Sequence, residues 1–368
     1  MQDAFTLNDA TNPPPSSDQS VSSAPRLGTF SELQQELRRR GLFEKDPKRI
    51  IRQFSTHILL TLVGIAIFIL SVHWSLYILG TAIWTIGLLG IGTSTHTATH
   101  SATFRSKRWN DLFAWLGYPI LLGFAATFWR EKHVVLHHGS PNVVGMDRDI
   151  DFLPYFAITD RDRAKQRGIA RLYYNVQWLF LPLALALNGL SMQAQGILFL
   201  FRHRTATPQE RNRIRIDALC LVAHAVMWIG LPLLFFSVQD VLLFYVLRSI
   251  CVGVGLFIIL APGHLPREAA CVMPAARHPN PVTAQIGATV NFRTGWLGRF
   301  VCSGLEYQIE HHLFPNISHT RLPEVSLLVR DYCRLHGVPY RTLGWAEAVI
   351  KSVAVFIVPK PVVCALSD

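Results

Sequence analysis

The chain has 368 residues, of which 50% are hydrophobic and 16% are charged, and its mean hydropathy is +0.27. Soluble domains usually carry about 25% charged residues, so this composition argues against a soluble enzyme and for a membrane protein. The formal net charge is +11. We expect that charge mainly on a cytoplasmic face, where it suits membrane lipids or a phosphate-bearing substrate carrier, and we expect no nucleic acid partner.

The N-terminal segment over residues 1–28 is rich in Pro, Ser, Asp and Gln, and this composition predicts a disordered tail. It contains no apolar run of the signal-peptide type, so we expect no cleaved leader. Basic residues then accumulate between positions 38 and 52, directly before the first long apolar stretch.

Four segments have the length and composition of transmembrane helices. No Lys, Arg, Asp or Glu occurs from Gln53 to Phe104. Because about 20 apolar residues cross a bilayer, this stretch predicts two spans, and a later apolar block predicts two more; the spans are at about 54–73, 74–95, 218–236 and 241–260. Basic residues flank both hairpins and are absent from their short connections, which places the termini in the cytoplasm by the positive-inside rule.

Two further apolar stretches, 112–128 and 176–201, have basic residues at both ends, and we interpret them as interfacial or re-entrant segments. Arg248 lies inside the fourth span, where an ionisable side chain is costly, and we expect it to extend outward toward Asp240. The predicted fold class is an all-α membrane protein with four transmembrane helices, arranged as two hairpins, and a cytoplasmic helical cap.

Three histidine clusters lie at or near the apolar stretches: HTATH at 96–100, HVVLHH at 133–138 and QIEHH at 308–312. In an α-helix, positions i and i+4 share a face, so His96 pairs with His100 and His133 with His137. His138 lies about 100° round from His137, so that segment can offer nitrogens to two centres. Neutral imidazole is a common ligand for transition metals, and we expect the cap to hold a di-metal site.

The residues around these clusters resemble the membrane fatty acid desaturase family. The resemblance covers roughly residues 30–335 and depends on three motifs: HTATHSATF at 96–104, WREKHVVLHHGSPNVVGMDRDID at 129–151 and GLEYQIEHHLFPNISH at 304–319. The third motif, with Gln in place of its first histidine, is similar to that of the front-end desaturases. The resemblance implies a non-haem centre of two Fe ions, O₂ as co-substrate, and formation of a cis double bond in an acyl chain.

The resemblance also implies a ligand set. It comprises the histidines of the three clusters and one histidine after the fourth span: His96, His100, His133, His137, His138, His264, His311 and His312. Gln308 is a candidate weak ligand, and His319 a candidate neighbour of the ligands. Because metal-bound histidines usually donate their second N–H to a carboxylate or carbonyl, the acidic residues after the second cluster are candidate partners: Asp147, Asp149 and Asp151. They could instead pair with nearby basic residues. We divide the chain into a tail (1–28), a desaturase domain (29–335) and a cytoplasmic C-terminal tail (336–368).

The expected substrate is a fatty acyl chain carried by CoA, acyl carrier protein or phospholipid. Many front-end members carry a fused cytochrome b5 domain with an HPGG motif, for which the first fifty residues are too short. We therefore expect electrons from a separate donor, either ferredoxin or cytochrome b5 with its reductase. The expected location is a multi-pass membrane protein with a cytoplasmic active site, in the cell inner membrane if the source is bacterial.

Two other functions are compatible with histidine clusters. A related di-iron hydroxylase or ketolase would insert oxygen into a lipid, although the QIEHHLFP string favours the acyl desaturases. A haem-binding electron-transfer protein or a metal transporter would place its ligands deep inside the spans, whereas these clusters lie at or beyond the span ends.

Overall fold

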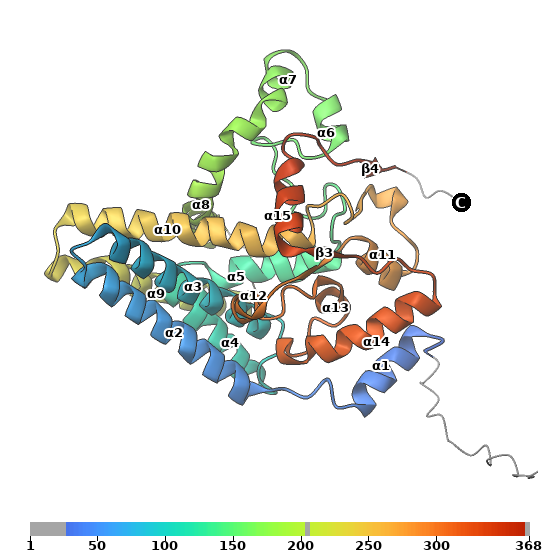
Figure 1. The fold of residues 1–368 in the computed structure, drawn as a ribbon, viewed down its shortest axis with the longest axis horizontal. Helices are drawn as coiled ribbons and strands as arrows, with labels where there is room; N and C mark the ends of the chain where they lie inside the picture. Colours follow the sequence, from blue (N-terminus) through green and yellow to red (C-terminus); the bar gives the residue numbers. More distant parts are fainter. Residues whose placement is uncertain (1–26, 203–206, 365–368) are drawn as a thin grey trace, which may run out of the picture.

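A computed structural model describes residues 27–202 and 207–364 of the chain. Long helices extend toward one end of the molecule, and shorter elements gather at the other end, which we call the cap (Figure 1). The predicted N-terminal tail, 1–28, lies outside the described residues except for its last two positions.

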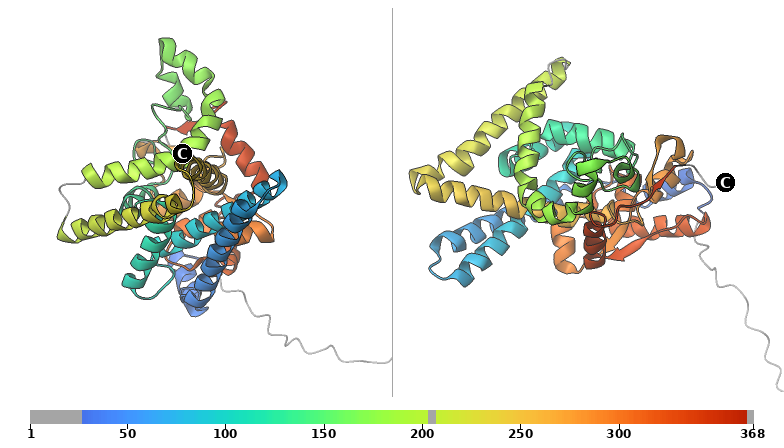
Figure 2. Two further views of the ribbon diagram at one scale, coloured as in Figure 1. Left: turned by 90° about the vertical axis from the view of Figure 1, so that its left-hand side faces the viewer. Right: turned by 90° about the horizontal axis from the view of Figure 1, so that it is seen from above.

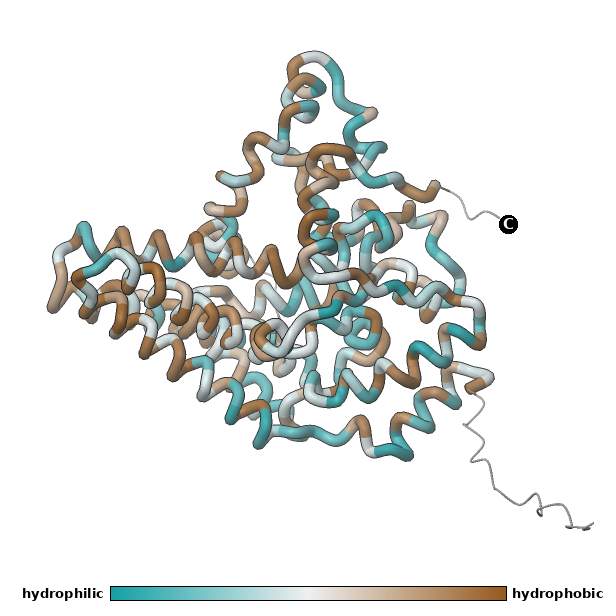
Figure 3. The backbone as a smooth tube through the Cα atoms, in the orientation of Figure 1, coloured by the Kyte–Doolittle hydropathy of each residue, from teal (hydrophilic) through white to brown (hydrophobic). Residues whose placement is uncertain are grey.

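The long helices form the part of the molecule that the sequence assigns to the membrane. They are α2 (Pro47–Leu70), α3 (Trp74–Thr99), α8 (Leu181–Arg202), α9 (Pro208–Ala225) and α10 (Val238–Leu260). Local sequence fixes their starts: Asp46, Thr207 and Ser237 each accept a backbone N–H of the first turn of α2, α9 and α10. Hydrophobic residues dominate these helices, and polar residues gather toward the cap (Figure 3).

Glycines bring α2 and α3 into close contact. A Cβ atom on Gly64 would lie 2.3 Å from the backbone nitrogen of Trp84, and one on Gly87 would lie 2.3 Å from the Thr61 hydroxyl. Small residues of this kind let two helices in a membrane approach at backbone distance. The predicted first hairpin is therefore a tightly packed pair. Its outer end lies apart from that of the α9/α10 hairpin (Figure 2).

Among the described residues, five helices are long and apolar enough to span a membrane, one more than predicted, or six if the bent pair at 107–137 counts as one span. Four correspond to the predicted spans, at Pro47–Leu70, Trp74–Thr99, Pro208–Leu234 and Val238–Gly263, and the fifth is Gln177–Arg202. The fifth helix crosses α10 at a steep angle instead of running alongside it (Figure 1). Gln177 at its start bonds Ala157 and Phe356 of the cap, and Phe199 near its end contacts Phe128. By length and hydropathy Gln177–Arg202 is itself a candidate span, where the sequence predicts an interfacial or re-entrant segment.

The segment 107–137 folds back on itself. It comprises α4 (Lys107–Trp115) with a wide π-type helix η1 (Leu116–Leu122), followed by α5 (Ala126–Trp129) with the π-type helix η2 (Arg130–His137). The two limbs meet at an angle of 112°, with Gly123 in the left-handed region at φ 81°. A bend of this size fits a broken span as well as the re-entrant segment that the sequence predicts for 112–128.

The cap consists of short elements. Its helices are α1 (Phe30–Arg39), α6 (Asp160–Ala164), α7 (Gly168–Asn175), α11 (Pro281–Gly287), α12 (Trp296–Cys302), α13 (Gln308–Leu313), α14 (Leu322–Leu335) and α15 (Trp345–Ala354). Short 3₁₀ or π turns occur both in the cap and next to the long helices: η3 (Gln177–Phe180), η4 (Val226–Gly230), η5 (Pro232–Leu234), η6 (Ala261–Gly263), η7 (Pro274–Ala276) and η8 (His319–Arg321).

Four short strands pair in parallel and connect the C-terminal region to the cap. Strand β1 (Cys271–Val272) pairs with β4 (Val362–Val363), and β2 (Asn291–Arg293) pairs with β3 (Thr342–Gly344). The Trp345 indole also donates to the Ile258 carbonyl at the end of α10. Residues 336–364, which the sequence assigns to a cytoplasmic C-terminal tail, therefore pack on the body of the molecule.

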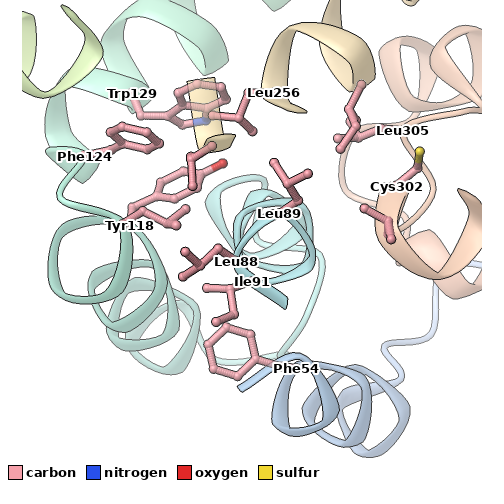
Figure 4. Close-up of a cluster of buried hydrophobic side chains, with 14 of the residues drawn as sticks. Phe54, Leu88, Leu89, Ile91, Tyr118, Phe124, Trp129, Leu256, Cys302 and Leu305 are labelled. Atoms are coloured by element: carbon pink, nitrogen blue, oxygen red, sulfur yellow. The ribbon is translucent and has the colours of Figure 1, made fainter. Parts of the chain in front are cut away.

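A buried apolar cluster joins the hairpins to the cap. Phe54 and Leu88 from α2 and α3 lie at one side, and Tyr118, Trp129 and Leu256 approach from the fold-back segment and α10 (Figure 4). Elements far apart in sequence thus share one core, directly beside the end of α3.

The prediction that Arg248 extends toward Asp240 is wrong. Arg248 is 1% exposed, and its guanidinium donates to the Leu121 carbonyl and lies 4.2 Å from the centre of the Trp228 ring. Inward orientation gives the cation a carbonyl and an aromatic face, both of which offset the cost of burial.

Candidate metal centre

The three histidine clusters and His264 converge in one place. Among the described residues, the rings form two all-histidine groups, within each of which the candidate ligand atoms lie within 4.8 Å of one another. A third group at the same spacing combines His133 and His137 with Asp149. The five-histidine group contains His96, His100, His133, His138 and His311. The three-histidine group contains His137, His264 and His312. All eight histidines that the resemblance implies as ligands therefore belong to one of the two groups.

The free nitrogens of these rings fit a metal ion. Among these eight histidines, five have a buried Nε2 atom without a hydrogen-bond partner, namely His100, His137, His138, His311 and His312. Unpaired buried polar atoms are costly unless they bind a ligand. In addition, Nε2 of His96 lies 2.8 Å from Nε2 of His133. Two nitrogens bound at about 2.1 Å and at right angles to one ion would lie about 3.0 Å apart, so this spacing suits shared coordination.

The first cluster lies at the end of α3, and its two histidines share one face of the helix, as their i, i+4 spacing predicts. The rings of His96 and His100 lie 4.7 Å apart, and α3 stops at His100 because Ser101 takes a left-handed conformation with φ 56°. The Thr99 hydroxyl donates to the His96 carbonyl. The helix end therefore presents both rings toward the cap.

The second cluster divides between the two groups. Its residues lie in η2, whose wider turns differ from the α-helix that the spacing assumes. The rings of His133 and His137 remain stacked at 5.0 Å, yet His137 belongs to the three-histidine group and His138 to the five-histidine group. The expectation that this segment offers nitrogens to two centres agrees with this division.

The third cluster forms the short helix α13. His311 and His312 have ring centres 5.6 Å apart and belong to different groups. Gln308 Oε1 lies 3.2 Å from His264 Nε2, so the amide is on the side of the three-histidine group. Burial and the nearby imidazoles of His264 and His137 hold the pKa of His312 well below its ordinary value. The ring is therefore neutral near pH 7, which is the form that binds metal.

Two of the three candidate aspartates support histidine rings. His137 Nδ1 donates to Asp147 Oδ2 over 2.9 Å, and His133 Nδ1 donates to Asp149 Oδ2 over 3.0 Å. These bonds turn the Nε2 atoms toward the centre. Although burial alone would raise the pKa of Asp149, the Lys132 ammonium and the bond from His133 hold it well below its usual range. Asp151 is exposed and accepts only the Leu153 backbone N–H at 3.4 Å, so it lies outside this arrangement.

His264 is held through its backbone. The Asn142 amide donates to the carbonyls of His264 and Ala288, and the buried Lys360 ammonium donates to the same His264 carbonyl. Asn142 has φ 56° and its own N–H bonds Asp147. Burial lowers the pKa of Lys360 to about 8. Asn142 thus connects the segment that follows the second cluster to His264.

His319 belongs to neither group. Its ring bonds the Thr97 hydroxyl at 2.8 Å and the Gln53 amide oxygen at 3.0 Å, and burial lowers its pKa to about 3. A cavity of about 10 Å³, near the lower limit for one water molecule, separates His319 from His96 and His311. His319 therefore links α2 and α3 beside the centre.

Several supporting residues carry no signal in the sequence. Gln285 accepts from Nδ1 of His312 and donates to the His138 carbonyl, so it touches both groups. Glu310 accepts from Asn291 and Tyr340 at 2.8 Å each. Burial raises the pKa of Glu310 to about 6. These contacts join segments up to 147 residues apart, and only the folded chain reveals them.

Comparison with known proteins agrees with this geometry. The family model described as fatty acid desaturase matches residues 25–344. The chain is 30% identical over 315 residues to the Delta(8)-fatty-acid desaturase of Euglena gracilis, covering 85% of this chain and 74% of that protein.

Two other relatives cover similar parts of the chain. The Delta(5) fatty acid desaturase fat-4 of Caenorhabditis elegans is 28% identical, with 85% of this chain and 69% of that protein covered. The sn-1 linoleoyl-lipid 6-desaturase of Synechocystis sp. is 26% identical, with coverages of 70% and 72%. The chain therefore belongs to the fatty acid desaturase family and is a multi-pass membrane oxidoreductase that desaturates fatty acyl chains.

Proposed function

We propose that the two histidine groups hold two Fe ions, one each, and that the enzyme uses them with O₂ to introduce a cis double bond. The supporting observation is the presence of unpaired, buried Nε2 atoms in both groups, within which the candidate ligand atoms lie within 4.8 Å of one another. Imidazole suits iron, and removal of hydrogen from an unactivated C–H bond requires a redox metal or another cofactor rather than side-chain acid–base chemistry.

The protein's own residues would orient the ligands and exclude water. Asp147 and Asp149 fix the tautomers of His137 and His133 by accepting hydrogen bonds from their Nδ1–H groups. Gln308 offers a neutral oxygen beside His264, which suits a weak ligand or a water-bridged one. Trp129 covers the five-histidine group, with its ring 4.7 Å from that of His133, and so keeps bulk solvent from that side.

We propose that the acyl chain approaches from the membrane side, because the centre begins where α3 ends. The four-span topology with a cytoplasmic cap remains our proposal, since the flanks of both hairpins are basic. The related enzymes are named for positions 5, 6 and 8, and we propose a double bond at a similarly low-numbered position. The carrier is CoA, acyl carrier protein or phospholipid.

We propose that a separate carrier protein, ferredoxin or cytochrome b5 with its reductase, delivers the electrons. The net charge of +11 suits an acidic carrier docking at the cytoplasmic face. Desaturation consumes O₂, two electrons and two protons together with two hydrogen atoms of the substrate, and releases two molecules of water.

The direct test combines lipid analysis with metal analysis. Expression in a host should create an unsaturated fatty acid two mass units lighter than its precursor, and the purified protein should contain iron. Substitution of His312 by Ala should remove the product and lower the iron content. Full activity of His312→Ala, or zinc in place of iron in the active enzyme, would refute the assignment.

A further inference from the structure

A polar cluster inside the long helices surrounds the point where the segment 107–137 folds back. Three consecutive carbonyls at the end of η1 each receive a side chain from a different helix. His224 of α9 bonds the Ile120 carbonyl at 2.8 Å, and Gln193 of α8 donates to the Leu122 carbonyl at 3.0 Å. Arg248 of α10 donates to the Leu121 carbonyl between them. We call His224, Gln193 and Arg248 the carbonyl clamp.

The fold-back explains why the clamp is needed. A helix that ends leaves its last carbonyls without intrahelical donors, and in an apolar environment each unsatisfied carbonyl costs several kcal/mol. η1 ends at Leu122 among helices that are long and apolar enough to span a membrane. The clamp supplies donors that the interrupted backbone no longer provides.

The charge of Arg248 has no acidic partner in the described part of the chain. None of the ion pairs found there involves this residue, which instead lies over the rings of Trp228 and Tyr245. A guanidinium stays charged in proteins. A positive charge at the carboxyl end of a helix interacts favourably with the partial negative charge of the carbonyls. The position of Arg248 therefore suits capping of η1 rather than a salt bridge.

Tyr245, which is not part of the clamp, connects two of its members, His224 and Gln193. Its hydroxyl lies 2.9 Å from Nε2 of His224 and 3.1 Å from Oε1 of Gln193. The single phenolic proton can satisfy one of these acceptors at a time. Gly123, the next residue after the clamped carbonyls, has no room for a side chain, because a Cβ would lie 2.7 Å from His224 Nε2.

The two limbs on either side of the clamp contact each other beside the five-histidine group. Tyr118 of η1 and Trp129 of α5 contact each other edge to face at 5.2 Å, and Trp129 lies against His96 and His133. Both aromatic rings point into the same cluster in Figure 4. The second limb continues into η2 with its histidines and is anchored at its start by the bond from the Thr127 N–H to Asp217.

We propose that Arg248, His224 and Gln193 are positioning residues of the metal centre, which act by fixing the fold-back point and thereby the second limb. The inference rests on the proposed metal function of η2. Loosening the clamp should let the second limb move, so that Trp129 and the second histidine cluster lose their alignment while the hairpins remain packed.

The test is hydrogen exchange of the backbone amides of 117–132 in the purified metal-free protein, comparing Arg248→Met, Tyr245→Phe and Asn188→Leu. Asn188 is the matched control, because its amide donates to the Gly253 carbonyl between α8 and α10 without touching the fold-back. Loss of a bond to a charged donor should speed exchange of these amides about tenfold in Arg248→Met. Tyr245→Phe should speed it about threefold, and Asn188→Leu should leave it within twofold.

Iron content and catalysis give the second measurement. Arg248→Met should bind less iron per chain and show a lower kcat with little change in KM, and Arg248→Lys should restore part of both. Equal exchange rates in Arg248→Met and Asn188→Leu would overturn the inference, and so would normal iron content with faster exchange. If Arg248→Met does not fold, unchanged exchange in Tyr245→Phe would overturn it. The exchange measurement needs no metal, so it can fail while the proposed function stands.

Discussion

The five-histidine group and the three-histidine group differ in how their rings are supported. The larger group draws rings from all three clusters, and Asp149, partly exposed, is the one carboxylate in ion-pair distance of its rings among the described residues. The smaller group has fewer rings, but His137 is paired with the fully buried Asp147, and His312 with Gln285.

The contrast extends to the backbone. In the three-histidine group, the His264 carbonyl receives both Asn142 and the buried Lys360. A site with few ligands loses a larger share of its binding when one ring turns, so stronger support from neighbours compensates for fewer nitrogens. We conclude that the smaller group depends more on its surroundings, and the larger group depends more on the number of its rings.

Removal of one ring should separate the groups most strongly. His312→Ala leaves two rings in the smaller group and should release one metal ion per chain. His311→Ala leaves four rings in the larger group and should retain its ion with weaker affinity. Both variants should lose at least about 1,000-fold in activity, because each removes a ligand from the centre at which the reaction takes place. Metal analysis after dialysis distinguishes them, and equal ion loss from both variants would contradict the comparison.

The two aspartates provide a matched pair with a smaller effect. Asp147→Asn removes the negative partner of His137, and a change of this kind typically costs 10–100-fold in metal affinity or activity. Asp149→Asn should lower the metal affinity less, because His133 is one of five rings in its group and Asp149 also forms an ion pair with Lys132. Titration of the metal-free variants with Fe²⁺ gives both affinities. A larger loss in Asp149→Asn would reverse the proposed dependence.

The smallest effect is expected from Glu306, whose carboxyl lies beside the third cluster. The neighbouring Glu310 accepts hydrogen bonds from two donors, whereas Oε2 of the buried Glu306 has no hydrogen-bond partner. Burial raises the pKa of Glu306 to about 7. Because this pKa is raised, the associated stability is present below about pH 4.5 and is lost as the pH rises through about 7.

Glu306→Gln should therefore be more stable than the wild type at pH 8, by about 3 kcal/mol at most, and equally stable at pH 4.5. Thermal unfolding in detergent at the two pH values measures the difference. A variant whose advantage is the same at both pH values would show that ionisation of Glu306 is not the cause.

Local spacing predicts much of the fold and of the site. The apolar stretches locate α2, α3 and α10 within about seven residues, because hydropathy and length indicate such helices. The third helix, α9, begins about ten residues before the predicted span, since its first turns are polar. The separation of His137 from His138 follows from helical geometry even though η2 has wider turns than an α-helix.

Contacts between distant segments could not be predicted. Arg248 is the clearest example, because its sequence neighbours offer Asp240, whereas the folded chain offers the Leu121 carbonyl and Trp228. Lys360 and Gln285 likewise approach the centre from segments without histidines. Their roles depend on which carbonyls and rings are left unpaired after folding, and a linear pattern does not record this.

Iron anomalous scattering from crystals of the metal-loaded protein tests the central proposal most directly. The proposal predicts two peaks, one within bonding distance of Nε2 atoms in the five-histidine group and one in the three-histidine group. A single peak, or peaks away from these nitrogens, would contradict it.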